Sequence, residues 1–267
     1  MRSRPIVTLL TDFGLRDPYV AQMKAVISSV CPRTVIVDIS HDVEKFNVRM
    51  GAFILASAAP YFPSGSIHVA VVDPGVGTKR LPIVVETKNF FFVGPDNGLL
   101  VLAAQADGIR HVYQITNQHY MRSTISYTFH GRDIFAPVAG HLANGVSLKK
   151  MGSKFLDYVI PSFSKPLIKN GKIVGEITYI DCFGNIVTNI PASLLEQLHV
   201  SQGVLLQLSI QRKKFVIRLC RAYEEVQFGE PLGIIGSHNF LELSMNQGNA
   251  AKVFRVLPGD SIELSLA

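Results

Sequence analysis

Four short segments of the chain place glycine beside carboxylate, amide or imidazole side chains. Three of them follow apolar, β-branched runs, as loops do at the ends of buried strands. Ligand sites of α/β proteins are built from such strand-end loops. The pattern therefore predicts a binding site assembled from these segments, which are TDFG at residues 11–14, VDPGVGT at 72–78, TFHGRD at 128–133 and DCFGN at 181–185.

Two carboxylates of these segments stand where apolar runs end. Asp12 could accept hydrogen bonds from paired hydroxyls such as a ribose diol, or could serve only the turn. Asp73 is followed by Arg80, and a carboxylate beside a guanidinium keeps its negative charge and a fixed geometry. Such a pair can orient a water molecule, whereas a surface ion pair is the structural alternative.

An imidazole and an aromatic turn complete the set. His130 follows Phe129 and precedes Gly-Arg-Asp, and no other histidine of the chain has comparable surroundings, although a lone histidine is commonly structural. In the fourth segment, Asp181, Phe183 and Asn185 fall within one turn. A phenyl ring that stacks and an amide that bonds a ring edge suit a flat heteroaromatic ligand, and a hairpin with a buried Phe183 is the alternative.

Other chemistries lack their sequence signatures. Residues 75–78 are not followed by Gly-Lys-Ser/Thr, which excludes a P-loop, and no Gly-x-Ser-x-Gly motif is present. Asp38, His41 and Asp42 could hold a metal, but no recognised spacing supplies further ligands, so a loop is favoured and no metal is expected. Residues 96–98, Asp-Asn-Gly, indicate a tight turn without an assigned catalytic role.

The composition describes a chain with a sizeable core. Of its 267 residues, 48% are hydrophobic, and no apolar run approaches the roughly 18 residues of a membrane helix. The formal net charge of +6 comes from scattered residues, so neither nucleic-acid nor membrane binding is expected. Asp12 interrupts the apolar residues 6–10, which favours a buried first strand over a signal peptide. Cys31, Cys182 and Cys220 are widely spaced and favour a reducing, cytoplasmic location.

Strands alternate with helical patterns in the first part of the chain. This order predicts an α/β domain with a central, mostly parallel sheet. Asp17 is placed to cap the first predicted helix. The predicted strands are residues 6–10, 35–39, 67–72, 83–86 and 90–93, and the predicted helices are residues 18–30, 49–59, 98–106 and 134–144.

The pattern changes near residue 160. A stretch rich in Pro and Ser, followed by Asn-Gly, predicts a linker and a turn. The short alternating segments beyond it predict a small all-β, barrel-like domain. We place the α/β domain at residues 1–160, the linker at 161–171 and the β domain at 172–267. The predicted strands of the β domain are residues 172–180, 204–208, 214–219, 251–255 and 261–266.

Six motifs in a fixed order resemble those of the S-adenosyl-L-methionine (SAM) hydroxide adenosyltransferases. These are adenosine-forming SAM hydrolases, related to the bacterial fluorinase and chlorinase. The resemblance covers nearly the whole chain and implies an α/β domain, a β-barrel domain and a homotrimer with active sites between subunits. The motifs are TDFG, VDPGVGT with Arg80, GPDNG at 94–98, FHGRD with Phe135 and Pro137, DxFGNxxTN from 181, and residues 236–237, 241–242 and 248–250.

The resemblance also implies a role for individual residues. Asp73, Arg80 and His130 match the family's water-activating triad. His238 departs from the pattern, since the halogenases carry an arginine there that helps to bind the substrate carboxylate, and a neutral histidine is a weaker partner. The implied binding residues are Asp12 for the ribose hydroxyls, Asp17 and Asp181 for the methionine ammonium, Ser237 for its carboxylate, Phe183 for stacking on adenine and Asn185 for the adenine edge.

The implied reaction converts SAM and water to adenosine and methionine, with SAM as the substrate and no cofactor. The first alternative is a halogenase of the same superfamily, which would need a small dry pocket without a competing base. A protein that binds SAM or adenosine without turnover is a second alternative. A metal-dependent phosphohydrolase, which would use the many aspartates, is a third.

Overall fold

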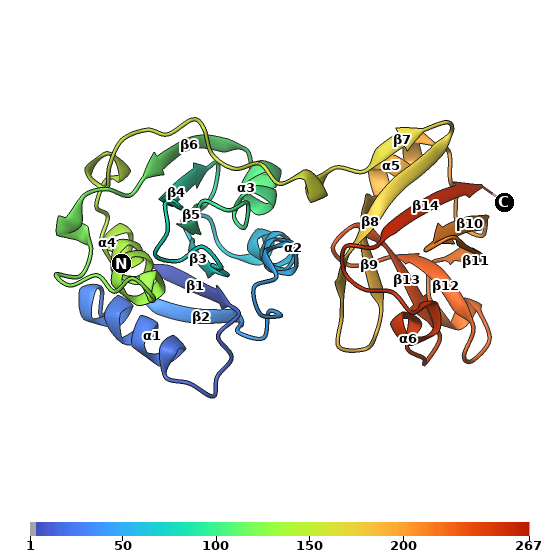
Figure 1. Cartoon of the computed structure of the whole chain (residues 1–267), viewed down its shortest axis with the longest axis horizontal. Helices are drawn as coiled ribbons and strands as arrows, with labels where there is room; N and C mark the ends of the chain where they lie inside the picture. The colour runs from blue at the N-terminus through green and yellow to red at the C-terminus, as the bar shows by residue number, and fades with distance from the viewer. Residues whose placement is uncertain (1–3, 267) are drawn as a thin grey trace. The chain divides into compact units, whose positions relative to one another are not determined.

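The computed structural model describes residues 4–266, which divide into two compact units (Figure 1). The first unit ends at Pro161 and the second begins at Ser162. The predicted linker, residues 161–171, includes the short turn Ser162–Ser164 (η5) and the strand Leu167–Lys169 (β7). Among residues 4–266, no helix is long and apolar enough to span a bilayer.

The first unit is built on a six-stranded sheet with the order β2-β1-β3-β5-β4-β6. The pairings of β1 with β2 and β3, and of β3 with β5, are parallel, whereas β4 pairs antiparallel with β5 and β6. This confirms the predicted α/β fold with a mostly parallel sheet. The strands are β1 Ile6–Thr11, β2 Val35–Ser40, β3 Ile67–Val71, β4 Pro82–Thr87, β5 Phe91–Pro95 and β6 Ile109–Gln114.

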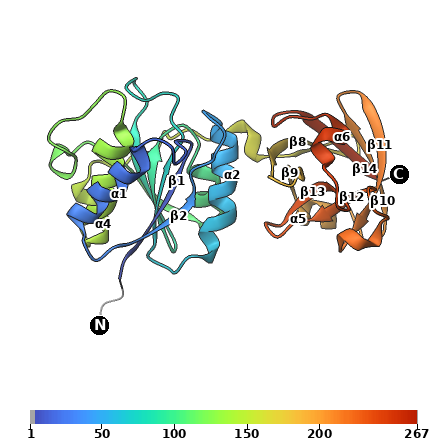
Figure 2. The same ribbon diagram turned by 90° about the horizontal axis from the view of Figure 1, so that it is seen from below.

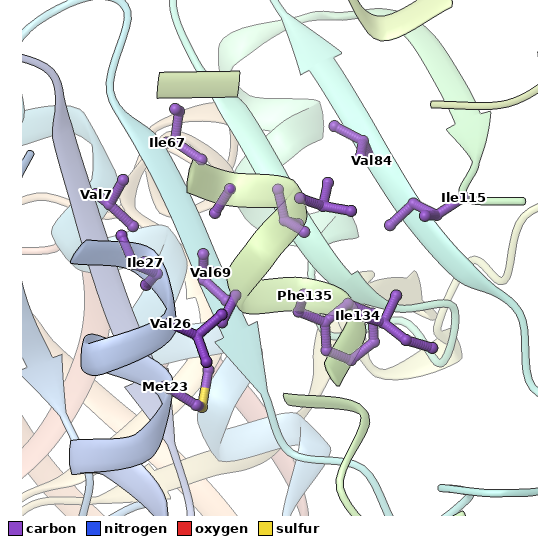
Figure 3. Packing of buried hydrophobic residues seen from close by; sticks show 14 of the residues in the cluster. Val7, Met23, Val26, Ile27, Ile67, Val69, Val84, Ile115, Ile134 and Phe135 are labelled. Atoms are coloured by element: carbon purple, nitrogen blue, oxygen red, sulfur yellow. The ribbon is translucent and has the colours of Figure 1, made fainter. Parts of the chain in front are cut away.

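Helices cover both faces of this sheet (Figure 2). Helices α1 (Tyr19–Val30) and α4 (Ala136–Ala143) pack on one face, and α2 (Val48–Ala58) and α3 (Val101–Asp107) on the other. Successive strand residues point to opposite faces, so Val7 of β1 joins the core under α1 and α4. Figure 3 shows Met23, Ile27 and Phe135 in this core, which closes the sheet from water and fixes the strand ends.

Seven strands of the second unit form a closed barrel. Their order is β14-β10-β11-β12-β13-β9-β8, and pairing of β14 with β8 closes the ring, which confirms the predicted barrel-like domain. β7 extends the sheet from β8. The barrel strands are β8 Lys172–Ile180, β9 Ile186–Pro191, β10 Leu205–Ile210, β11 Lys213–Cys220, β12 Pro231–Ile235, β13 Phe240–Met245 and β14 Ser261–Leu266, and the helices are α5 Ala192–Gln197 and α6 Ala250–Phe254.

Two local predictions are wrong. Residues 251–254 lie in helix α6 and Arg255 ends it, so the segment is no strand; the Asn249 side chain caps the helix by accepting from the backbone N–H of Lys252. Asp17 does not cap α1, because Pro18 takes the N-cap position and the helix has no side-chain cap.

A histidine is fully buried in the first unit. His68 lies on β3, and its Nδ1 is 2.8 Å from Thr8 Oγ1. Its ring stacks on Phe92 with the centroids 5.0 Å apart. Burial lowers the pKa of His68 from 6.5 to about 4, because an imidazolium would lose its hydration there. The ring is therefore neutral in the folded protein at pH 7.

This burial predicts acid sensitivity. As the pH falls below about 6.5, the unfolded chain takes up a proton at His68, while the folded protein does not until about pH 4. Between pH 7 and pH 4.5 the parent should lose roughly 2.5 kcal/mol more free energy of unfolding than His68→Phe, measured by urea titration at both pH values. A control variant at an exposed histidine, His111→Asn, should follow the parent. Parallel pH dependences for the parent and His68→Phe would contradict the prediction.

Candidate active site

Asp73, Arg80 and His130 form one connected cluster in the first unit. Arg80 donates from Nε to Asp73 Oδ1 at 3.1 Å, and its Nη2 bonds Asp73 Oδ2. The same Nη2 lies 3.0 Å from His130 Nδ1. The side chains of Arg80 and Asp73 are only 6% and 5% exposed. The structure thus brings together the three residues that the sequence singled out, and the pair is no surface ion pair.

Strand ends and one helical turn position this cluster. Asp73 follows β3, Arg80 precedes β4, and His130 directly precedes a π-helical turn, Gly131–Phe135 (η3), that leads into α4. Such π turns are frequent at functional sites. Pro137 lies in the first turn of α4, directly after the π turn.

The loop between Asp73 and Arg80 depends on one glycine. Gly77 has a φ of +76°, and a Cβ there would lie 2.3 Å from the carbonyl oxygen of Tyr127. Only glycine allows both this left-handed conformation and this close approach. The loop that carries the carboxylate is therefore packed directly on the segment that leads to His130.

The arginine and aspartate after His130 have a structural role. The Asp133 side chain is fully buried, accepts from Arg132 Nε at 2.7 Å and accepts the backbone N–H of Ser126 at 2.9 Å. These bonds tie the turn to the preceding loop. They explain why the acidic residue of the FHGRD motif does not face the cavity.

The contact with Arg80 determines the protonation of His130. A guanidinium can only donate hydrogen bonds, so His130 Nδ1 must accept, and the neutral ring carries its proton on Nε2. Burial lowers the pKa of His130, and the charge of Arg80 lowers it further. His130 is therefore neutral at pH 7 and can donate from Nε2, while the carboxylate of Asp73 is the acceptor of the pair.

Asp12 lies in the same cavity, directly after β1. The residue is 5% exposed, and its Oδ2 accepts the backbone N–H of Phe46 at 2.9 Å. Lys45 Nζ bonds the backbone oxygen of Asp12. The cavity has a volume of about 260 Å³, and its lining includes Asp12, Asp17, Lys45, Phe46, Asp73, Phe129 and His130.

Lys45 and Phe46 are among the residues of this cavity that sequence reasoning missed. Phe46 has a φ of +65°, a conformation that is strained for a bulky side chain, and its own side chain is exposed. The motif around them, Glu-Lys-Phe-Asn, contains no glycine that would signal a left-handed residue. The next residue, Asn47, caps α2 by accepting the backbone N–H of Met50. This contact fixes the backbone directly after Phe46.

Aromatic rings form one wall of the cavity. Phe129 contacts Phe13 and Tyr19 edge-on, with centroids 5.7 Å and 5.2 Å apart. Asp17 stands at the rim and is exposed. The cavity thus combines an apolar wall with three carboxylates and a neutral imidazole.

The fourth segment forms a tight turn between β8 and β9 in the second unit. Asp181 Oδ1 accepts the backbone N–H groups of Phe183 and Asn185 at 2.9 Å and 2.8 Å, and its Oδ2 accepts the Asn185 side-chain amide at 2.9 Å. Gly184 has a φ of +87°, and a Cβ there would meet the Asn249 side chain at 2.2 Å. Phe183 is 75% exposed, so the alternative of a buried phenyl ring is wrong.

This turn borders a groove of about 880 Å³ on the barrel. Because the Asn185 nitrogen is bonded to Asp181, the amide oxygen is its available acceptor. The groove is lined by Phe183, Asn185, Tyr223, Glu224 and the segment from Met245 to Gly248, among others. An exposed phenyl ring beside an acceptor is the arrangement that a flat heteroaromatic ring requires.

The remaining sequence-predicted residues lie apart from this groove's lining. Ser237 is exposed in the turn between β12 and β13. His238 Nε2 lies 2.6 Å from Glu242 Oε1, and both side chains are largely buried. The imidazole at the position that departs from the family pattern is therefore engaged with a carboxylate of its own barrel.

The Asp38, His41 and Asp42 segment forms a local network. His41 Nε2 lies 3.1 Å from Asp38 Oδ1, and His41 Nδ1 lies 2.8 Å from Thr11 Oγ1. Within residues 4–266, no group of three or more His, Cys, Asp or Glu side chains is arranged to hold a metal ion. The histidine instead links the end of β2 to the end of β1, next to Asp12.

Residues 7–152 match the model of the SAM hydroxide adenosyltransferase N-terminal domain, and residues 175–263 match that of the C-terminal domain. The chain belongs to the SAM hydroxide adenosyltransferase family. The two matched regions carry the cavity and the barrel groove, respectively.

Individual relatives match almost the full length of this chain. A Salinispora tropica protein named (R)-S-adenosyl-L-methionine hydrolase is 37% identical over 268 residues, 99% of each chain. A crystal structure of a conserved protein from Thermotoga maritima gives a TM-score of 0.91 at 41% identity, covering 97% of this chain and 99% of that one. A fluorinase from Actinopolyspora mzabensis is 27% identical, covering 98% of each chain.

The cluster predicts how the imidazole responds to loss of its neighbour. In Arg80→Met, the pKa of His130 should rise, because the guanidinium charge that lowers it is removed while the charge of Asp73 remains. Titration of the His130 ring by NMR measures this change. An exposed arginine outside the cluster, Arg110→Met, should leave the His130 midpoint where it is. An unchanged midpoint in Arg80→Met would refute the assigned contact.

Proposed function

We propose that this protein hydrolyses SAM to adenosine and L-methionine by in-line attack of an activated water on the C5′ carbon. The observation that carries the proposal is the buried Asp73–Arg80–His130 cluster, which shares a cavity with Asp12. Family membership and the relatives named (R)-S-adenosyl-L-methionine hydrolase support the same reaction. Because the names of these relatives specify the (R) form, the (R) epimer at sulfur is the proposed substrate.

The leaving group needs no help from the protein. C5′ is bonded to a sulfonium, which departs as a neutral thioether, so neither a general acid nor a cofactor is required. Because neutral water is a poor nucleophile, the protein must supply positioning and a proton acceptor. Exclusion of bulk water would further favour a step that disperses the sulfonium charge.

The cluster suits both tasks. In the proposed mechanism, His130 donates from Nε2 to the oxygen of the attacking water and so aims a lone pair at C5′. Asp73 accepts the proton of that water, while Arg80 holds Asp73 and His130 in place through its donors. This choice follows from the tautomer, since the Nδ1 of His130 is already occupied by Arg80.

The other residues would bind the substrate from both units. Asp12 accepts the ribose hydroxyls, and Asn185 Oδ1 accepts from the exocyclic amine of adenine while Phe183 stacks on the ring. Each carboxylate oxygen has two lone pairs, so Asp181 can hold its turn and still accept the methionine ammonium together with Asp17. Ser237 is proposed to bond the methionine carboxylate.

We also propose a homotrimer, in which the cavity of one subunit and the groove of the next share one substrate. The two sets of binding residues lie on separate compact units, which fits a site completed by assembly.

A cytoplasmic location is also proposed. The cysteines Cys31, Cys182 and Cys220 are all free, which supports a reducing, cytoplasmic setting.

A halogenase is disfavoured by the same cluster. The carboxylate of Asp73 would repel a halide and would hydrate the place that the halide must occupy. The fluorinase relatives are also less similar than the hydrolases, at 26–27% against 33–37% identity.

Asp73→Asn tests the proton acceptor. The amide keeps the shape of the side chain but cannot take a proton, so kcat should fall on the order of 10²- to 10³-fold with little change in KM. Chromatography of reactions with and without chloride measures adenosine, methionine and 5′-chloro-adenosine. The exposed carboxylate variant Asp42→Asn should retain the parent rate. Unchanged turnover in Asp73→Asn would reject the role, and a chlorinated product would reject the hydrolase.

Phe183→Ala tests the adenine contact. Loss of stacking should weaken SAM binding on the order of tenfold, seen as a higher KM with a smaller change in kcat. Phe228→Ala is a matched control, because Phe228 is 76% exposed, on the same unit, and outside the groove lining. Equal KM values for the two variants would contradict the assignment.

Mixing two impaired variants, assayed with SAM well below the parent KM, tests the assembly. Subunits of Asp73→Asn and Phe183→Ala, unfolded and refolded together, should regain part of the parent activity if each site draws on two subunits. Activity no higher than the mean of the separate proteins would reject a shared site.

A further inference from the structure

One motif has no part in the mechanism above, the Asp-Asn-Gly turn at residues 96–98. It connects β5 to α3 and lies beside the strand ends that carry the cluster. Pro95 of β5 is paired in register with Pro82 of β4, so the turn begins directly opposite the start of β4. Asp96 and Asn97 are both half-buried.

The turn bonds the residue next to each member of the Asp73–Arg80 pair. The backbone N–H of Asp96 donates to the carbonyl oxygen of Leu81 at 2.9 Å, directly after Arg80. The Asn97 side-chain amide donates to the carbonyl oxygen of Val72 at 2.8 Å, directly before Asp73.

Asn97 is itself held in place. Its side-chain oxygen accepts the backbone N–H of Leu99 at 3.1 Å, so the amide is oriented from both ends. Two strand ends that are not neighbours in the sheet, β3 and β4, are thereby linked through one turn.

The Asp96 carboxylate adds charge to this link. Its Oδ1 accepts the backbone N–H of Val159 at 2.9 Å. Burial raises the pKa of Asp96, the charge of Arg80 opposes that rise, and the exposed Asp157 adds to it. Arg80 and Asp96 therefore interact electrostatically, and Arg80 Nη1 is a buried donor without a hydrogen-bond partner among the described residues.

We propose that the Asp96–Asn97 turn is a positioning element of the hydrolytic cluster. Asn97 fixes the strand end that carries Asp73, and the Asp96 backbone fixes the strand end that carries Arg80. The Asp96 carboxylate compensates the guanidinium charge from outside the cluster. Once Asp73 takes up the proton of the water, it no longer neutralises Arg80, so this second carboxylate stabilises the guanidinium and assists the step without touching the substrate. The proposal rests on the proposed hydrolysis.

The test compares Asp96→Asn with the parent enzyme. The variant keeps the backbone bond to Leu81 and an acceptor for Val159 but loses the charge. We expect kcat to fall about tenfold with KM for SAM nearly unchanged. The acid limb of the pH profile, where kcat falls as the pH is lowered, should have its midpoint about half a pH unit lower. The less compensated guanidinium charge then disfavours proton uptake by the cluster. Asp96→Glu, which keeps the charge, should restore the parent acid limb.

Two further variants separate charge from geometry. Asn97→Ala should lower kcat without moving the acid limb, since no charge changes. Asp157→Asn removes an exposed carboxylate from the same neighbourhood and should keep the parent kcat. Thermal unfolding of each variant shows whether it is folded. Parent values of kcat and of the acid limb in folded Asp96→Asn would overturn the proposal.

A measurement without substrate keeps the two proposals distinguishable. In Asp96→Asn, NMR titration of the ring should show a further lowering of the pKa of His130, because Arg80 is less compensated. A parent enzyme that forms no adenosine would reject the hydrolase, while the titration still judges the turn. An unchanged His130 midpoint would reject the role of Asp96 whatever the turnover.

Discussion

The buried guanidinium of Arg80 is the constraint on which the site depends. A positive charge with so little exposure is costly unless it is paired. The carboxylate of Asp73 pairs with it by accepting from two nitrogens of the guanidinium. Because arginine only donates, its second contact leaves the imidazole of His130 in one tautomer. One side chain thus holds an acceptor and a donor at fixed positions beside a single cavity.

The fold of the first unit supplies the rigidity that this pairing needs. The cluster is held by ends of strands in a sheet that helices cover on both faces, so its backbone cannot relax without disturbing the core. Near the cluster, Phe46 has a strained left-handed backbone, and Gly77 packs closely on the backbone of Tyr127. The second unit has a different task, because its barrel presents an exposed phenyl ring on a turn that Asp181 organises.

Continuous apolar runs were the most reliable guide to the fold. They located β1 and β3, because strands buried on both faces are apolar along most of their length. β6 and β13 carry polar residues and were not predicted, since their stability comes from neighbours that the local pattern does not contain. The local pattern of residues 251–255 predicts a strand, but the segment is helical through residue 254 because Asn249 caps the helix.

By itself, the sequence determined the residue types, their order at the ends of apolar runs and hence the family. It did so because motifs and strand periodicity are local properties of the chain. Only the tertiary structure decided that His130 meets Arg80 across 50 positions, which nitrogen of its ring accepts, and that Phe46 orients Asp12. It also decided that Asp96 and Asn97 bind the strand ends beside the cluster. Hydrogen bonds between distant segments depend on how the loops close over the sheet, and that closure is set by packing of the whole unit.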